Sequence, residues 1–229
     1  MTNEWFNKGR LNEVLYAEHF LKQHPMRCVK GKLYTVDGAV SDEAALRQEI
    51  YYELKCCVTS DMSRNITKAV ECIKLACYVQ EPPLQTDRIH VANGTVYIDN
   101  GINGHSDITL RYDHDKEFCM SRLPVNYDPD SPKPKKWLAF LEELLHPEDI
   151  PTLQEYLGYC LIPTTKAQQM CMLIGRGGEG KSRVGLVMRA IFGEAMTYNS
   201  LQKVEENRFA RADLEHKLLM VDDDMRLSH

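Results

Sequence analysis

Eight consecutive residues, 175–182, constrain the fold more than any other part of the chain. They read Gly-Arg-Gly-Gly-Glu-Gly-Lys-Ser, which fits the Gly-x-x-x-x-Gly-Lys-Ser pattern of a phosphate-binding loop. The apolar run 169–174 before the loop predicts a buried strand, and apolar residues at helical spacing in 184–192 predict a helix after it. A strand, a glycine-rich loop and a helix in this order predict an α/β P-loop NTPase domain.

The residue types in this loop suit ATP bound with Mg²⁺. Glycines let the backbone approach phosphate oxygens and direct N–H groups at them, and the start of the following helix adds partial positive charge. We expect Lys181 to contact the β- and γ-phosphates and the Ser182 hydroxyl to bind Mg²⁺. The bland alternative is a glycine-rich turn with a solvated lysine. The expected nucleotide-binding residues are Gly175, Arg176, Gly177, Gly178, Glu179, Gly180, Lys181, Ser182 and Arg183.

A second apolar segment, 217–221, ends in three acidic residues, Asp222, Asp223 and Asp224. This pattern predicts a buried strand of the Walker B type, with one carboxylate holding Mg²⁺ and a neighbouring acid orienting the attacking water. An acidic loop after a core strand is the alternative. By spacing alone, any adjacent pair of the three can serve. The candidate metal residues are Ser182, Asp222 and Asp223, and the candidate catalytic residues are Lys181, Asp223 and Asp224.

The charge balance and the apolar pattern argue against several classes of protein. The formal net charge is −5, which disfavours a surface built throughout to bind nucleic acid but leaves room for local basic faces. No stretch approaches the roughly 18 unbroken apolar residues of a membrane span, and residues 1–10 lack the apolar core of a signal peptide. We therefore expect a cytoplasmic protein without a membrane partner. The eight cysteines contain no Cys-x-x-Cys pair, so we interpret them as reduced core thiols rather than as zinc ligands or a disulfide framework.

The part before the proline-rich stretch predicts a small α+β domain. Its pattern indicates a helix that ends at Pro25, a hairpin over 26–36 with a Lys-Gly turn, and two helices within 41–78 that suggest a helix-turn-helix. Ser41 or Asp42 would cap the first of these two helices and Ser63 the second. A later hairpin is expected around Asn93-Gly94, with positive φ in its turn.

Three polar residues of the second of these helices, Arg64, Asn65 and Lys68, lie away from its apolar face. They could contact DNA phosphates or base edges, and a solvated helix face is the alternative. Because residues 124–134 are too rich in proline for a helix or a central strand, we place the domain boundary there. The expected domains are 1–122, a linker at 123–135, and a helical collar with part of the ATPase at 136–229.

Several longer blocks resemble the phage and plasmid primase-helicases of superfamily 3, a group related to poxvirus enzymes. The resemblance also extends to the Asn93-Gly94 hairpin and the helices before it. It implies an AAA+-like superfamily 3 helicase core, preceded by an α+β domain for which a winged-helix-like arrangement is one option. The matching blocks are 123–130 (Leu-Pro-Val-Asn-Tyr-Asp-Pro-Asp), 153–161 (Leu-Gln-Glu-Tyr-Leu-Gly-Tyr-Cys-Leu), the phosphate-binding loop, 208–214 (Arg-Phe-Ala-Arg-Ala-Asp-Leu) and 217–224.

The resemblance implies an ATPase that assembles as a ring, usually hexameric, and translocates along DNA during replication of a mobile element in a bacterial cytoplasm. Asp223 with Asp224 best fits the paired acids of these enzymes. Glu179 stands where many relatives have Asn, and its charge could weaken nucleotide affinity unless Arg176 or Arg183 offsets it. The sensor asparagine, the DNA-contacting hairpin and the arginine finger would follow Asp224. We therefore expect a fragment that binds ATP or ADP but hydrolyses ATP negligibly by itself.

Two other functions remain open from the sequence. One is a P-loop kinase acting on a small molecule, for which an acceptor site and an arginine-rich lid would be expected after the Walker B strand. The other is a DNA-binding adaptor whose P-loop only senses nucleotide, which the possible helix-turn-helix favours. DNA-stimulated ATP turnover by the complete protein would distinguish a helicase from both.

Overall fold

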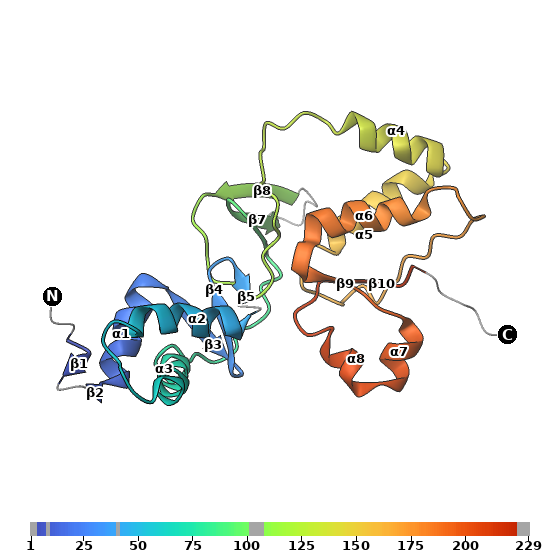
Figure 1. Ribbon diagram of the computed structural model, residues 1–229. Coiled ribbons are helices and arrows are strands. Elements are labelled where there is room, and N and C mark those ends of the chain that lie inside the picture. The colour runs from blue at the N-terminus through green and yellow to red at the C-terminus, as the bar shows by residue number, and fades with distance from the viewer. Residues whose placement is uncertain (1–3, 8–9, 40–41, 101–107, 224–229) are drawn as a thin grey trace. The chain divides into compact units, whose positions relative to one another are not determined.

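The computed structural model describes residues 4–7, 10–39, 42–100 and 108–223 and divides into two compact units, Met1–Pro83 and Leu84–His229. Both units mix helices with small sheets (Figure 1). The units meet at the Pro82-Pro83 pair, where the missing N–H groups and the restricted backbone disfavour both helix and sheet. The boundary expected at 123–135 instead falls inside the second unit. Within the described ranges, no helix is both long and apolar enough to cross a membrane.

Three helices build the core of the first unit (blue to cyan in Figure 1). They are α1 (Glu13–Gln23), α2 (Glu43–Leu54) and α3 (Met62–Ala76). Apolar side chains at helical spacing face one another, which explains why these segments fold as amphipathic helices. The fully or almost fully buried members of this core are Tyr16, Ala17, Phe20, Ile50, Leu54, Ala69, Val70 and Ile73.

The caps of these helices agree with the sequence in part. Asp42 caps α2 by accepting a hydrogen bond from the Ala44 N–H at 2.8 Å, as expected. The expectation that Ser63 caps α3 is wrong, because α3 already begins at Met62, after Asp61 in the left-handed region with φ 52°. The connection between α2 and α3, residues 55–61, is also longer than the three or four residues usual in a helix-turn-helix.

Short antiparallel sheets complete the first unit. Lys30 and Gly31 both have positive φ, 49° and 80°, as a tight hairpin turn between β3 and β4 requires, so the expected Lys-Gly hairpin is confirmed. After α3 the chain returns to β3. There the Cys28 N–H donates to the Cys77 carbonyl at 2.8 Å, and the Val79 N–H donates to the Cys28 carbonyl at 3.0 Å. The strands are β1 (Phe6–Asn7) with β2 (Arg10–Leu11), and β3 (Met26–Val29), β4 (Lys32–Thr35) and β5 (Gly38–Ala39) in that order.

The second unit begins with an antiparallel sheet of β6 (Arg88–Val91), β7 (Gly94–Asn100) and β8 (Ile108–Asp113). Val91 pairs with Gly94, so the turn lies one residue earlier than expected, and Gly94 does not have positive φ. Glycine is required there for a different reason: a Cβ would collide with the backbone carbonyl of Asp113.

The segment expected to link two domains is part of the core of this unit. Leu123 is 2% exposed and packs with the helices of the unit, and Val125 packs against the same cluster. Backbone hydrogen bonds tie both residues to the sheet, from the Leu123 N–H to the His90 carbonyl at 2.9 Å and from the Ala92 N–H to the Val125 carbonyl at 2.9 Å. The start of the expected linker is therefore part of this unit.

Helices and one parallel strand pair form the rest of the second unit. The register pairs Leu219 with Met196 and Val221 with Tyr198, and α6 lies against β9 (Figure 1). The core contains buried side chains from α4 (Leu141), α5 (Leu153) and α6 (Val184, Met188 and Phe192). The elements are α4 (Lys135–Leu144), α5 (Asp149–Tyr159), α6 (Lys181–Phe192), the 3₁₀ turn η1 (Gly193–Ala195), β9 (Met196–Tyr198), α7 (Leu201–Glu206), α8 (Arg208–Ala212) and β10 (Leu219–Val221).

The expected strand at 169–174 is absent, and this is the main correction to the predicted P-loop domain. The segment has no regular secondary structure, and Met170 and Ile174 are 63% and 86% exposed. Within the part of the chain that the structure describes, β9 and β10 pair only with each other. A strand needs a neighbour for its backbone groups, so an apolar run without one stays irregular.

The cysteines only partly follow the expectation of core thiols. All eight are free, and Cys28, Cys119 and Cys160 are buried. Cys56 and Cys171, however, are exposed.

Candidate nucleotide-binding site

The glycine-rich loop leads directly into α6, whose first residue is Lys181. Gly178 and Gly180 have φ values of 87° and 97°, in the left-handed region that side chains other than glycine rarely adopt. A Cβ on Gly175 would meet the Glu179 carboxylate, which is the free end of a flexible side chain. Two of the four glycines in the loop, Gly178 and Gly180, are therefore required by its backbone geometry.

Lys181 turns its amine back into the loop. Its Nζ donates to the Arg176 carbonyl at 2.6 Å and lies 3.4 Å from a carboxylate oxygen of Glu179. The Lys181 side chain is 25% exposed and the Glu179 side chain 46%. Two oxygen acceptors near the solvent thus hold the amine at the loop. An incoming anion can take their place as its partner.

The other expected nucleotide-binding residues lie open to solvent. All residues of 175–179 are exposed, as are Ser182 and Arg183 in the first turn of α6. The first N–H groups of any helix have no acceptor within that helix, and the helix dipole places partial positive charge at the same end. These donors, the Lys181 amine and the Ser182 hydroxyl are the chemistry that a polyphosphate with Mg²⁺ needs, so the residues present fit such a ligand.

An aromatic pair from α4 supports the loop. Gly180 faces Phe140, whose ring lies 3.5 Å from where a Cβ on Gly180 would stand. Trp137 lies next to Phe140, with ring centroids 5.7 Å apart. The sequence predicts this apolar helix face but not its contact with the loop, since that contact joins residues 40 positions apart.

Two tyrosines of α5 hold the segment that leads to the loop, and sequence reasoning missed both. The Tyr159 hydroxyl donates to the Thr164 carbonyl and accepts from the Ala167 N–H, both at 3.0 Å. Burial raises the pKa of Tyr156, while a hydrogen bond with the Cys171 backbone acts in the opposite direction. Both residues belong to the 153–161 block.

The acidic residues after β10 take different positions. Asp222 accepts a hydrogen bond from the Leu201 N–H at 2.9 Å and so caps the start of α7. Asp223 is exposed, and Asp224 lies outside the described residues. Val221 pairs with Tyr198, whose hydroxyl lies 3.0 Å from where a Cβ on Gly185 would stand, so the end of this strand pair lies beside α6.

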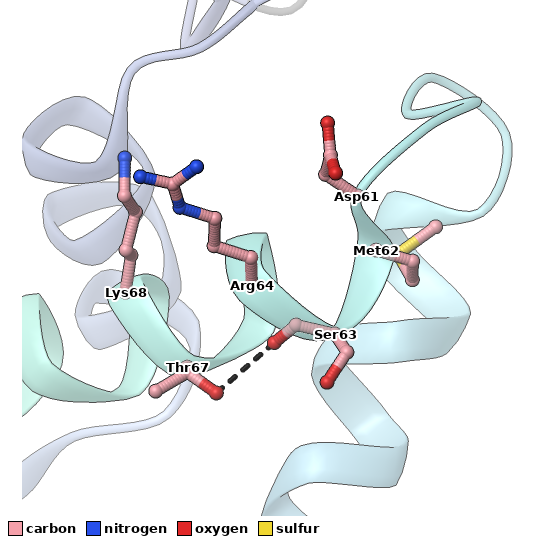
Figure 2. A pocket seen from close by; sticks show the side chains of 6 residues that line it. All are labelled: Asp61, Met62, Ser63, Arg64, Thr67 and Lys68. Atoms are coloured by element: carbon pink, nitrogen blue, oxygen red, sulfur yellow. Dashed lines mark hydrogen bonds between the residues drawn. The ribbon is translucent and has the colours of Figure 1, made fainter.

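Two of the three residues expected to contact DNA, Arg64 and Lys68, line an open pocket in the first unit, and Asn65 does not. The pocket has a volume of about 590 Å³ and lies at the start of α3. Figure 2 shows Arg64 and Lys68 extending from the same side of this helix. The pocket is lined by Asp61, Met62, Ser63, Arg64, Thr67 and Lys68.

Only part of this polar face is available to a partner. The Lys68 amine lies 2.9 Å from the Glu13 carboxylate and lowers the pKa of that acid. The Asn65 side chain donates to the Ser60 carbonyl at 3.2 Å and so fixes the connection before α3. Among the described residues, no ion pair engages Arg64.

Residues 17–146, more than half of the chain, match the family described as D5 N terminal like, so the chain belongs to that family. Residues 173–229 match a family of unknown function (DUF5906). This combination is typical of phage and plasmid D5-like primase-helicases, which confirms the resemblance seen in the sequence. No curated protein matches the chain.

Proposed function

We propose that the chain binds ATP and Mg²⁺ as part of an ATP-dependent DNA helicase that acts in the replication of phage or plasmid DNA. The observation that carries the proposal is the glycine-rich loop, which delivers the Lys181 amine and the start of α6 to one exposed place. The family context of D5-like helicases supports the same activity. On this proposal the second unit is the beginning of a P-loop NTPase domain, and the complete protein forms a ring, most simply a hexamer.

Each residue of the site then has a defined task. The first N–H groups of α6 and the Lys181 amine bind phosphate oxygens, and Ser182 with Asp222 or Asp223 holds Mg²⁺. The bound metal supplies charge that neutralises the phosphates. Asp223, which is exposed, and Asp224 orient water for attack on the terminal phosphate. Asp222 couples this site to α7 through its capping bond with Leu201.

Titration with ADP and Mg²⁺ tests the nucleotide site. Trp5 and Trp137 are the two tryptophans of the chain, so Trp5→Phe leaves Trp137, next to Phe140 at the loop, as a local fluorescent probe. We expect saturable binding that is lost in Lys181→Ala and retained in Lys203→Ala, which removes an exposed lysine of α7. Equal affinity in wild type and Lys181→Ala would contradict the assignment.

We further propose that Arg64 and Lys68 contact the phosphates of DNA. The pocket beside them and the solvent-exposed Arg64 side chain favour this contact, while Lys68 must exchange Glu13 for a phosphate. Fluorescence anisotropy with a short duplex and a single strand should show affinity that falls as salt rises, because bound cations are released. Arg64→Ala should weaken binding several-fold, whereas Lys74→Ala, which removes a Glu43-paired lysine of the same helix, should not.

A further inference from the structure

Three groups converge at the start of the phosphate-binding loop. A Cβ on Gly175 would collide with the Glu179 carboxylate and would lie 3.2 Å from the Lys181 amine. The carboxylate and the amine are themselves 3.4 Å apart. Glu179 therefore folds back over the entrance of the loop and places a negative charge beside the cation that binds phosphate.

The two arginines nearest in sequence do not offset this charge. Neither Arg176 nor Arg183 forms an ion pair with Glu179 in the described ranges, although the sequence left this compensation open. Lys181 is thus the cation that the carboxylate engages. The start of α6 adds partial positive charge to the same place, which stabilises an anion there whether it is a carboxylate or a phosphate.

A carboxylate and a phosphate oxygen make the same kind of contact with an ammonium group. A phosphate that binds the Lys181 amine must either displace the carboxylate or accept a second anion within a few ångströms, and both reduce affinity. Glu179 can move aside, since its side chain is 46% exposed and its pair with Lys181 is only weakly shielded from solvent.

We propose that Glu179 sets the nucleotide affinity of the loop by competing with phosphate for Lys181. The inference rests on the proposed nucleotide site and adds a residue whose role there is to oppose binding. Nucleotide enters when the Glu179 side chain rotates out of the loop, and Lys181 exchanges the carboxylate and the Arg176 carbonyl for phosphate oxygens. The resulting loop binds nucleotide less tightly than its glycine pattern alone would allow.

Glu179→Gln keeps the size of the side chain and removes its charge, so it separates competition from shape. We expect ADP with Mg²⁺ to bind about three- to tenfold more tightly to this variant, which corresponds to the range for an exposed ion pair together with like-charge repulsion. The gain should shrink at about 1 M salt, where such interactions are screened. Glu194→Gln is the matched control, because Glu194 is an exposed acid of the same unit paired with Arg189 at 3.2 Å.

Calorimetric titration of wild type, Glu179→Gln, Glu194→Gln and Lys181→Ala distinguishes the outcomes. If Lys181→Ala abolishes binding but Glu179→Gln binds like wild type, the nucleotide site stands and competition by Glu179 is refuted. A gain that is unchanged by salt, or is matched by Glu194→Gln, also refutes it. If wild type and Glu179→Gln both fail to bind ADP, the nucleotide site and the competition are refuted together.

Discussion

Replacing Arg122 by alanine tests how the second unit is held together. The Arg122 side chain is buried, and its guanidinium donates to three backbone carbonyls: Val91 at 2.7 Å, Gly94 at 3.0 Å and Glu117 at 2.5 Å. The first two flank the turn between β6 and β7, and the third lies in the loop after β8. One side chain thus joins the turn of the hairpin to a loop that comes later in the chain.

The expected loss of stability follows from these bonds. A hydrogen bond from a charged donor is worth about 1.5–3 kcal/mol, so three would suggest about 5–9 kcal/mol. Burying a guanidinium costs several kcal/mol, and the alanine variant is free of that penalty. We therefore expect the free energy of unfolding of the second unit to fall by about 3 kcal/mol. With a urea slope of about 1–3 kcal/mol per M, the midpoint should drop by about 1–3 M.

Urea unfolding followed by Trp137 fluorescence, in a Trp5→Phe background, measures this unit specifically. Trp137 packs against the same core as Leu123 and Ile89, so loss of the sheet should reach the probe. Arg111→Ala is the control, because this arginine of the same sheet is 58% exposed and should cost at most about 1 kcal/mol. Equal midpoints for the Arg122 and Arg111 variants would refute the reasoning.

Three further measurements address other parts of the second unit. Burial, followed by the charge of Arg122, lowers the pKa of His90 from 6.5 to about 4, so the folded state favours the neutral ring. As the pH falls from 6.5 to 4, the free energy of unfolding should therefore drop by about 3 kcal/mol. Urea unfolding measures this loss, which should be smaller in His90→Gln. Gly180→Ala, at φ 97°, should cost about 1–2 kcal/mol in stability and weaken ADP binding, whereas unchanged binding would show that the loop tolerates a side chain. Asp222→Ala should destabilise the start of α7 by about 1 kcal/mol, which faster amide exchange over Leu201–Glu206 would reveal.

Local signals predicted the first unit well. The Lys30-Gly31 turn needs two residues with positive φ, and the cap of α2 needs a short side chain with a hydrogen-bond acceptor, so both follow from residues close in sequence. The helix faces around Phe20 and Ile73 follow from helical spacing in the same way. Such features depend on a few neighbouring residues and can be read without knowing what packs against them.

Features that depend on distant partners were missed or misplaced. The run 169–174 has the composition of a strand, but a strand also needs a neighbour, and composition does not provide one. Arg122 was predicted to be the last residue of a domain. Nothing in the nearby sequence indicates that its side chain bonds to a carbonyl as far away in the chain as that of Val91. Gly94 was expected for its φ, yet the approach of Asp113 explains it.

In the candidate site, too, the features set by nearby residues were predicted and those set by distant partners were not. The glycines and Lys181 were found because their spacing is local, and their geometry suits the expected chemistry. The contact of Asp222 with Leu201 and the hydrogen bonds of Tyr159 come from the fold and were not foreseen. The sequence also indicated that the charge of Glu179 could weaken nucleotide binding, but only the structure identifies Lys181 as the group that it engages.

The return of the chain from α3 to β3 gives the first unit a mechanical property. Cys28 is joined to this exit segment by two backbone hydrogen bonds, in a parallel bridge with Tyr78. A pull on the chain beyond residue 83 loads both bonds together, in shear, rather than opening them one after the other. Tension on the exit segment therefore reaches the core of α1, α2 and α3 only after both of these hydrogen bonds have broken.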